Sequence, residues 1–308
     1  MSSRSIAVLM GGPDAEREVS LASGAAVAAA LSASGWHVAS HVIDRPTAGD
    51  IAAMEGDVFF PVLHGPWGEG GPLQVLLEQD GRPFVGSSAG AAAMCMDKAR
   101  VKHAARKLGI RTPDWDLVGV DREPRLDPPA VVKPNDEGSS IDLHQCDTRD
   151  AVLRAAASVA ARRGSALVES WITGRELTVG LLAGEPLPIV EIVPADGCYD
   201  YEAKYTRTDT RYRLTPHLPG EAASRMRDAA ELLCTALGVR DVARVDFLLD
   251  EAGWWMLEVN TMPGFTRHSL LPMAADAAGL GMPEVCHRLA TLAASRGSTS
   301  PTGVSRGD

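Results

Sequence analysis

Residues 241–260, DVARVDFLLDEAGWWMLEVN, predict two β-strands that are joined by a tight turn. Residues 251–253 fit a three-residue hairpin loop, because Gly253 can adopt the left-handed backbone conformation that such a loop needs. Asp250 then pairs with Trp254 across the loop, and this first pair sets the register of the whole hairpin.

The predicted register gathers four polar side chains on one face of the hairpin. Asp246 lies opposite Glu258, and Arg244 lies opposite Asn260, because side chains alternate between the two faces of a strand. The other face is apolar, and its residues are Ala243, Val245, Phe247, Leu249, Trp255, Leu257 and Val259.

The polar face has two interpretations on spacing alone. One face of an antiparallel hairpin is commonly solvated. Alternatively, two carboxylates and an amide would repel one another without a cation between them, and such hard oxygen ligands suit Mg²⁺ with phosphate oxygens in its shell. Arg244 and Asp246 interrupt an apolar run, and Asn260 leads directly into a loop, which favours the metal site.

Composition restricts the class of protein. The 308 residues suffice for two or three domains with cores of their own. A net charge of −10 argues against a nucleic-acid partner held by phosphate contacts. The five cysteines include no CxxC pair, which indicates a reducing compartment. There is no signal-peptide pattern, and no apolar run approaches the ~18 residues of a membrane span. We therefore expect a soluble cytoplasmic protein with no membrane partner.

The order of the expected elements predicts an α/β fold. Strands at residues 5–10, 37–44 and 58–63, with a helix at 15–34, alternate as in a parallel sheet. Further helices are expected at residues 73–80, 97–108, 149–163, 220–237 and 283–294. Further strands are expected at residues 83–86, 129–134, 166–170, 177–183 and 188–193. Residues 296–308 are rich in Ser, Gly, Thr and Pro and should form a disordered tail.

Several loops could contact a ligand, and each also has an ordinary structural explanation. Gly11-Gly12 fits an anion cradle or a plain turn before a helix. Residues 64–71, HGPWGEGG, fit a close-approach loop or a flexible turn. Residues 199–205, YDYEAKY, fit a lid or a surface loop. Residues 262–270, MPGFTRHSL, could present backbone N–H groups to an oxyanion or simply connect two elements.

Two lysines are candidates for phosphate contacts. Lys98 shares a predicted helix with Arg100 and Lys102, so a solvated basic face also explains it. Lys133 ends an apolar strand, which is unusual for a solvated residue, and the Gly/Ser loop at residues 137–140 could fold over phosphates.

These segments follow one another in a distinctive order: MGGPDAEREVSL, LHGPWGEGGPLQ, MDKARVK, VVKPNDEGSS, DYEAKY, ARVDFLLD and EVNTMPGFTRHSLLP. From about residue 6 to residue 294, the chain resembles the D-alanine–D-alanine ligases, members of the ATP-grasp superfamily. The resemblance implies an ATP-grasp fold of the α/β class, α+β overall, with three domains around a central cleft. The first domain would be an N-terminal Rossmann-like parallel-sheet domain (1–93). The second would be a central ATP-grasp subdomain with the phosphate-covering loop (94–178), and the third a C-terminal ATP-grasp subdomain with the metal and catalytic face (179–295). The tail (296–308) would follow them.

The resemblance also implies the activity. ATP would phosphorylate the carboxylate of a first D-alanine, and the amine of a second would attack the acyl phosphate. Phosphate would leave from the tetrahedral intermediate, and the product would serve peptidoglycan synthesis. ATP and two Mg²⁺ (or Mn²⁺) ions would be the cofactors, two D-alanine molecules the substrates, and a homodimer the assembly. Such chemistry depends on positioning and charge stabilisation.

Where residues match the family motifs, the resemblance implies their roles. The metal ligands would be Asp246, Glu258 and Asn260. ATP phosphates would be contacted by Lys98, Lys133 and Lys204, and the adenine and ribose by Glu169, Ile172 and Glu176. The first D-alanine would be bound by Glu16 and His64, and the second by Ser269 and Leu270. Glu16, Ser139 and Tyr205 would form a hydrogen-bonded triad, and Arg244 and the Gly264 N–H would form the oxyanion hole.

Four positions depart from the family pattern. Asp142 stands where a glycine is expected, so we expect backbone strain and an unfavourable charge beside the phosphates. The other departures are Gly70 for an aspartate, Ser170 for a lysine near the adenine, and Arg267 for a small residue.

These departures leave two alternatives to the dipeptide-forming ligase. One is a related ligase with D-serine or D-lactate as the second substrate, or one of specialised metabolism. The other is a catalytically weak ATP-binding or regulatory protein. Tyr205 favours dipeptide formation by resemblance, and the complete set Arg244, Asp246, Glu258 and Asn260 argues against the weak protein.

Overall fold

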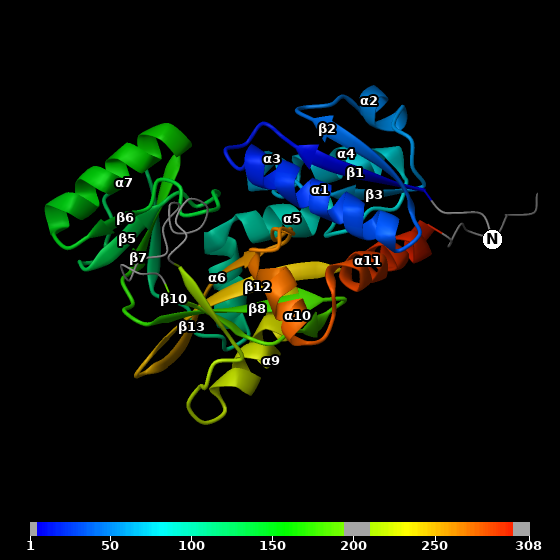
Figure 1. The fold of residues 1–308 in the computed structure, drawn as a ribbon. Coiled ribbons are helices and arrows are strands. Elements are labelled where there is room, and N and C mark those ends of the chain that lie inside the picture. The colour runs from blue at the N-terminus through cyan, green and yellow to red at the C-terminus, as the bar shows by residue number, and fades with distance from the viewer. Residues whose placement is uncertain (1–4, 194–209, 298–308) are drawn as a thin grey trace, which may run out of the picture.

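The computed structural model describes residues 5–193 and 210–297, and these residues form three β-sheets (Figure 1). The mixture of parallel and antiparallel sheets with covering helices agrees with the predicted α/β class. The predicted lid at residues 199–205, with Lys204 and Tyr205, lies outside the described residues, as does the predicted tail from residue 298 onward.

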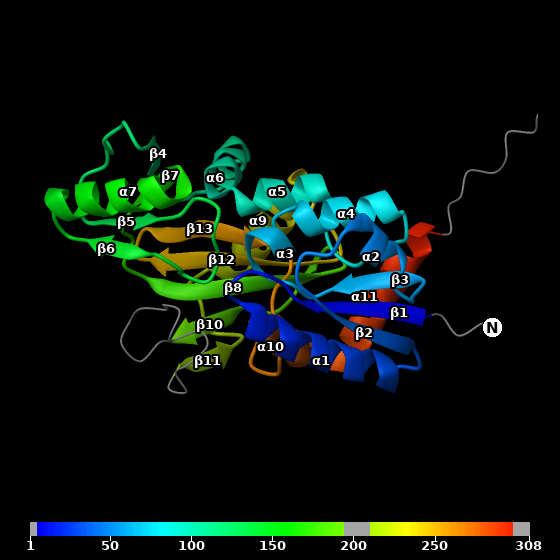
Figure 2. The same cartoon turned by 90° about the horizontal axis from the view of Figure 1, so that it is seen from above.

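The first sheet is parallel and has the strand order β2-β1-β3. Its strands are β1 (Ser5–Gly11), β2 (His37–Ile43) and β3 (Val58–Pro61). The helices around it are α1 (Arg17–Ala33), α2 (Ala48–Ala52), α3 (Gly65–Gly68), α4 (Pro72–Asp80) and α11 (Met282–Gly297). Ile6 and Val8 of β1 share a core with α1 and α11, whereas Ala7 and Leu9, on the other face, share one with α2 and α4. Figure 2 shows α11 beside this sheet, although it is the last described element in chain order.

The second sheet is antiparallel and has the strand order β4-β7-β5-β6. Its strands are β4 (Trp115–Gly119), β5 (Ala130–Lys133), β6 (His144–Cys146) and β7 (Ser165–Ser170). Helix α7 (Arg149–Arg163) covers one face, where Val152 and Val159 pack against Val168. Alternation along the strands turns Lys133 and Glu169 toward the opposite face, which lines a pocket.

The third sheet is also antiparallel and has the order β11-β10-β8-β12-β13, with β9 paired to β8. Its strands are β8 (Arg175–Leu182), β9 (Glu185–Pro186), β10 (Val190–Val193), β11 (Arg211–Leu214), β12 (Val242–Asp250) and β13 (Gly253–Asn260). The nearby helices are α5 (Ala89–Met96), α6 (Lys98–Lys107), α9 (Ala222–Ala236) and α10 (Leu270–Ala277). Ala243, Val245 and Phe247 are buried in a core with α6 and α9. A Cβ at Gly180 of β8 would lie 2.9 Å from the Leu271 side chain, so glycine allows α10 to approach the sheet closely.

The hairpin has the predicted residue pairs around Asp246, but its turn is shorter than predicted and strand β13 contains a β-bulge. Asp250 pairs with Gly253, not with Trp254, so the turn holds residues 251–252 and is one residue shorter than predicted. A β-bulge then shifts the register between Asp246 and Phe247, with Leu257 as the extra residue. The bulge restores the predicted pairs, Asp246 with Glu258 and Arg244 with Asn260.

The bulge also corrects the predicted faces of β13. Trp255 and Leu257, which were predicted to face the core, do not belong to it. Trp254 and Met256 pack against the core instead, and Leu257 lines a pocket together with Glu258. A shorter turn exchanges the faces of every residue before the bulge, because the side-chain period of a strand is two.

Other departures from the predicted elements are local. The strand predicted at residues 83–86 is a single bridge between Phe84 and Phe59. Elements absent from the prediction are α2, α3, α5, α10, β4, β6, β9 and β11. Helix α11 continues through Arg296 and Gly297, which the prediction assigned to the tail. Arg296 is held there by Asp241, whose carboxylate it contacts at 2.6 and 2.7 Å.

The sheet topology also bears on the predicted domain boundaries. The boundary between residues 178 and 179 falls inside β8, and the one between 93 and 94 falls inside α5. We therefore place the division between the second and third sheets ahead of Arg175. Among the described helices, none is both long and apolar enough to cross a membrane.

Candidate active site

Two pockets meet at the polar face of the hairpin. The β5–β12 pocket, a cavity of about 190 Å³, lies between the second and third sheets. The α1–α10 pocket, about 500 Å³, lies between the first sheet's helices, the hairpin and the start of α10. Glu258 and Gly138 line both pockets, so the two cavities adjoin at the hairpin.

The predicted site residues divide between the two pockets. Those in the β5–β12 pocket are Lys98, Lys133, Glu169, Ile172, Glu176, Asp246 and Glu258. Those in the α1–α10 pocket are Glu16, His64, Ser139, Arg244, Glu258, Asn260, Gly264, Ser269 and Leu270. Lys204 and Tyr205 lie outside the described residues.

Asp246 is the centre of the polar face. Arg244 contacts both of its carboxylate oxygens at 2.9 Å. The hydroxyl of Thr178, on the neighbouring strand β8, donates to Oδ1 at 2.6 Å. The side-chain amide of Asn260 donates to Oδ2 at 3.2 Å. The predicted grouping of these side chains on one face is confirmed.

The side-chain oxygens on this face are suitable ligands for a divalent cation that also binds phosphate. Asp246 and Glu258 supply carboxylates from paired positions on adjacent strands, and Asn260 supplies an amide oxygen. Among residues 5–193 and 210–297, no cluster of three or more His, Cys, Asp or Glu side chains could hold a metal by itself. A cation here would therefore need oxygens from a ligand, as Mg²⁺ bound with phosphates does.

Lys98 is buried, in contrast to the solvated basic face considered for it. Its Nζ donates to the Glu137 carbonyl at 2.5 Å and lies 3.4 Å from Glu258 Oε2. Helix α6 begins at Lys98 with Asp97 as its N-cap, because the Asp97 side chain accepts the Arg100 N–H. Lys98 thus connects the Gly/Ser loop to the hairpin.

Lys133 and Glu169 form an ion pair in the wall of the β5–β12 pocket. A second lysine, Lys102, pairs with the other oxygen of Glu169. Burial raises the pKa of Glu169, but the two lysines outweigh burial and lower it to about 2. Glu169 is therefore a buried carboxylate with a positive charge on either side.

The Gly/Ser loop is joined to the start of α1. The Ser139 hydroxyl donates to Glu16 Oε1, and both residues line the α1–α10 pocket. Glu16 is buried, and Gly138 leaves room beside it, since a Cβ there would lie 3.5 Å from Glu16 Oε2. Two members of the predicted triad are therefore in contact.

His64 and Glu69 lie side by side at the base of the α1–α10 pocket. His64 Nδ1 is 3.0 Å from the Met262 carbonyl, and its buried Nε2 has no hydrogen-bond partner among the described residues. Burial lowers the pKa of His64. Burial and the charge of Glu16 raise the pKa of Glu69 to about 8, although the Met262 and Gly65 N–H groups donate to it. Neither side chain is fully charged near neutral pH.

The loop before α10 is tightly packed. A Cβ at Gly264 would lie 2.6 Å from Ser269 Oγ. Ser269 Oγ accepts the Thr266 N–H at 3.1 Å, and the Phe265 N–H donates to Ser23 of α1 at 3.1 Å. A side chain at residue 264 would therefore displace the Ser269 hydroxyl.

Asp142 does not face the pocket that the Gly/Ser loop covers. It has a positive φ of 56°, as expected for a position that favours glycine. Arg162 of α7 contacts its two oxygens at 2.6 and 2.7 Å, and His144 lies 2.8 Å away. Arg162 therefore neutralises Asp142 outside the pocket, and the structure gives no support to the expected unfavourable charge beside the phosphates.

The other three departures have local explanations. At Gly70, a Cβ would lie 2.3 Å from the Pro66 carbonyl oxygen, so the backbone there excludes a side chain. Ser170 lines the β5–β12 pocket, and the positive charges beside Glu169 come from Lys102 and Lys133. Arg267 donates to His268 at 2.9 Å, and His268 lines the α1–α10 pocket.

Two features in and behind the β5–β12 pocket differ from the expectations from sequence. Lys102 is fully buried, although the prediction assigned it to a solvated face. Its spacing of four residues from Lys98 was the available signal, because residues i and i+4 share a helix face. Leu257 lines the pocket only because of the bulge, and the sequence offers no signal for that bulge.

The Gly11-Gly12 turn is not part of either pocket. A Cβ at Gly11 would lie 2.7 Å from the Ile43 carbonyl oxygen. Arg17 donates to the Gly12 carbonyl at 2.7 Å. These contacts support the plain turn rather than the anion cradle.

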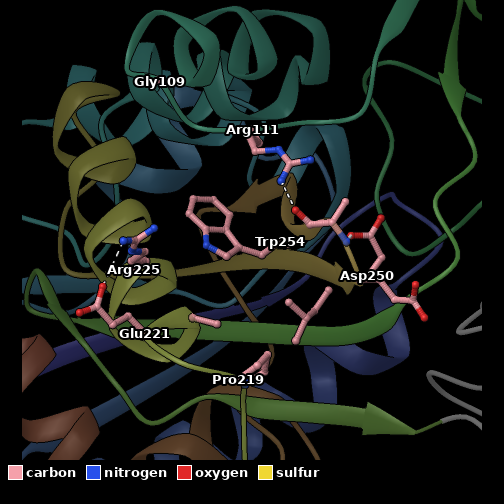
Figure 3. A pocket seen from close by; sticks show the side chains of 12 residues that line it. Gly109, Arg111, Pro219, Glu221, Arg225, Asp250 and Trp254 are labelled. Carbon is pink, nitrogen blue, oxygen red and sulfur yellow. Dashed lines mark hydrogen bonds and ion pairs between the residues drawn. The ribbon is translucent and has the colours of Figure 1, made fainter.

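A third cavity, of about 560 Å³, lies beside the turn of the hairpin (Figure 3). Arg111 donates to the Ala252 carbonyl at 2.6 Å, and Arg225 pairs with Glu221 at 3.1 Å. Because both arginines have partners within the cavity wall, its geometry does not indicate a charged ligand.

Both the sequence and the structure of this chain are similar to those of known proteins. Residues 114–291 match the family model described as D-ala D-ala ligase C-terminus. A D-alanine–D-alanine ligase from Dechloromonas aromatica is 43% identical over 297 residues, which cover 94% of this chain and 97% of that protein. One from Ectopseudomonas mendocina is 41% identical over 281 residues, covering 89% and 90% of the two chains. A crystal structure of D-alanine–D-alanine ligase from Bacillus anthracis complexed with ATP has a TM-score of 0.84 at 31% identity and covers 96% of this chain and 98% of that one.

Proposed function

Because the chain belongs to the D-alanine–D-alanine ligase family, we propose that it joins two molecules of D-alanine into D-alanyl-D-alanine, with conversion of ATP to ADP and phosphate. The product supplies peptidoglycan precursor synthesis. In this proposal, the β5–β12 pocket takes ATP and the α1–α10 pocket takes both D-alanines.

The observation that carries the proposal is the meeting of the two pockets at Glu258 and Gly138. A phosphoryl group can pass from one substrate to another only if both reach the same point. A γ-phosphate in the first pocket and a carboxylate in the second would meet over the polar face of the hairpin. The basic side chains at this junction, Lys98 and Arg244, match the negative charge of both reactants.

In the first step, a carboxylate oxygen of the first D-alanine attacks the γ-phosphorus of ATP. The bond to ADP breaks, and an acyl phosphate forms. Lys98 and Lys133 stabilise the phosphate charge from the β5–β12 pocket. Glu16, held by Ser139, binds the ammonium of this D-alanine, and His64 lies beside it.

In the second step, the deprotonated amine of the second D-alanine attacks the acyl carbon. The tetrahedral intermediate carries an oxyanion, which Arg244 and the Gly264 N–H stabilise. Its collapse releases phosphate, and the nitrogen loses a proton to the departing phosphate, which leaves the peptide bond. Ser269 and Leu270, at the start of α10, hold the second D-alanine.

The remaining assignments concern the nucleotide and the metal. Glu169, Ile172 and Glu176 contact the adenine and ribose, and Lys204 and Tyr205 act from the lid. Asp246, Glu258 and Asn260 are the proposed ligands of two Mg²⁺ (or Mn²⁺) ions, which neutralise charge on the phosphates when bound.

Phosphate release tests this function. The protein is incubated with ATP and Mg²⁺ across a panel of D-amino acids and D-lactate, and the products are identified by mass spectrometry. Activity with D-alanine alone, giving the dipeptide, supports the proposal. Activity that requires D-serine or D-lactate as the second substrate would replace it with the related ligase, and no activity with any acceptor would refute ligation.

The family resemblance also supports two proposals about the protein in the cell: it is a homodimer, and it works in the cytoplasm without nucleic-acid or membrane partners. Light scattering after size-exclusion chromatography tests the first. A monomer at micromolar concentration would contradict it.

A further inference from the structure

Lys102 is a fully buried lysine that lines neither pocket. It lies in α6, and its Nζ has two polar partners elsewhere in the chain. Its Nζ pairs with Glu169 of β7 and donates to the Thr112 hydroxyl at 2.6 Å. A lysine buried to this degree costs free energy unless it is paired, and Glu169 and Thr112 are the polar partners that offset this cost.

Glu169 shares its charge between two lysines of different exposure. One oxygen contacts Lys102, inside the protein, and the other contacts Lys133, which lines the β5–β12 pocket. Both lysines contact the same carboxylate. The electrostatic attraction between Glu169 and Lys133 therefore depends on whether Lys102 is charged. Without Lys102, the full negative charge of Glu169 would act on Lys133 in a buried setting.

We propose that Lys102 is a positioning residue for nucleotide binding: by pairing with Glu169 from behind the pocket, it keeps the ammonium of Lys133 available to the phosphates of the nucleotide. The proposal rests on the proposed function in one respect, that the β5–β12 pocket takes ATP. Lys102 itself touches neither the nucleotide nor the reacting atoms.

A purely structural role for Lys102 predicts a different pattern of effects. If the Lys102–Glu169 pair only stabilises the contact between α6 and the second sheet, its loss should lower the free energy of unfolding without changing the ADP affinity of the folded protein. If Lys102 instead weakens the attraction of Glu169 for Lys133, loss of Lys102 should reduce the affinity for ADP only while Glu169 carries a charge.

Four proteins separate these possibilities: the unaltered chain, Lys102→Met, Glu169→Gln, and the double variant. The measurement is the dissociation constant of Mg²⁺-ADP by titration calorimetry, with circular dichroism as a check on folding. We expect Lys102→Met to weaken ADP binding about tenfold when Glu169 is present, and by less than about twofold in the Glu169→Gln background. An equal loss in both backgrounds, or no loss in the single variant, would overturn the proposal.

Lys107→Met is the matched control, because Lys107 is exposed on the same helix. The change of residue type is the same, and ADP binding should not change. A comparable loss of ADP affinity in Lys107→Met would show that the effect belongs to the charge of α6 in general and would also overturn the proposal.

The unaltered protein provides a second test that does not depend on the folding of a variant. The charged groups that act on Lys102 are Glu169, Lys133 and Arg106, and burial outweighs the attraction of Glu169, so that the pKa of Lys102 falls to about 8. Lys102 therefore loses its charge as the pH rises through about 8, and the dissociation constant of Mg²⁺-ADP should increase at least about threefold between about pH 7 and about pH 9. A constant affinity over that range would contradict the proposal.

The ADP readout also keeps this proposal distinct from the ligase assignment. If ADP binding follows the expected pattern and no dipeptide forms, the ligase assignment fails and the role of Lys102 stands. If the dipeptide forms but Lys102→Met binds ADP normally, the role of Lys102 fails and the ligase assignment stands.

Discussion

Asp246 lies directly opposite Glu258 because a short turn and a β-bulge offset each other. The turn removes one residue from the predicted loop, and the bulge at Leu257 adds one to β13. As a result, Leu257 and Glu258 both line the β5–β12 pocket, whereas Met256 is completely buried in the core.

This arrangement predicts opposite effects for two neighbouring residues. Met256→Ala should lower the free energy of unfolding by about 2–5 kcal/mol, because it leaves a cavity in the core. Leu257→Ala should change stability much less and should raise the KM for ATP several-fold, with little change in the KM for D-alanine. Denaturant unfolding and steady-state kinetics check both. The reverse assignment of the two effects would mean that the bulge is absent.

The ion pair between Asp142 and Arg162 predicts how the Gly/Ser loop tolerates its aspartate. Asp142→Gly should leave the KM for ATP within about twofold of its original value, because the carboxylate is neutralised outside the pocket. Steady-state kinetics with varied ATP is the measurement, with Arg162→Ala as the companion variant. A clear fall in the KM for ATP in Asp142→Gly would show that the aspartate does act on the phosphates.

Glu69 predicts a pH dependence of stability. Its pKa is raised from 4.5 to about 8 in the folded protein, chiefly by burial and then by Glu16. The folded state therefore binds more protons than the unfolded state above pH 4.5, and the stabilising contribution is lost as the pH rises through about 8.

Glu69→Gln should remove this loss, since glutamine stays neutral. The melting temperature of the variant should fall less than that of the original chain between pH 5 and pH 9, where the shifted group titrates. Thermal unfolding across this range is the measurement. Parallel curves for the two proteins would show that Glu69 ionises normally.

The close packing around Gly264 predicts a steric effect on the binding of the second D-alanine. In Gly264→Ala, the new Cβ would lie 2.6 Å from Ser269 Oγ, so the loop before α10 must move. We expect kcat/KM for the second D-alanine to fall at least about tenfold while ATP binding persists. Gly90→Ala is the control, because a Cβ at Gly90 meets nothing within 4 Å. Normal kinetics in Gly264→Ala would exclude this backbone from the oxyanion hole.

The elements with strong local signals were predictable from sequence. Helix α7 was predicted at its observed bounds, because Thr148 caps its start and Gly164 ends it in the left-handed conformation. Short elements such as α2 and β9 were missed because they have too few residues to establish a period. Arg296 was assigned to a tail because its partner, Asp241, is distant in sequence.

In the candidate site, too, features that depend on contacts between residues distant in the sequence were hard to predict. The pairing of Asp246 with Glu258 was predicted correctly, but through two errors that offset each other. The burial of Lys102 depends on the packing of α6 against Glu169, a residue that is distant in the sequence. The surroundings of Asp142 likewise depend on Arg162, which lies in a separate helix.

In the proposed reaction, a carboxylate in the α1–α10 pocket receives the γ-phosphoryl group of ATP over the polar face of the hairpin. Transfer of ¹⁸O tests it most directly, with D-alanine labelled in both carboxylate oxygens, unlabelled ATP and Mg²⁺. If an acyl phosphate forms and the second amine displaces phosphate, each phosphate released with a dipeptide carries one ¹⁸O from the substrate. Phosphate that carries no ¹⁸O would show that water attacks ATP directly and would contradict the account.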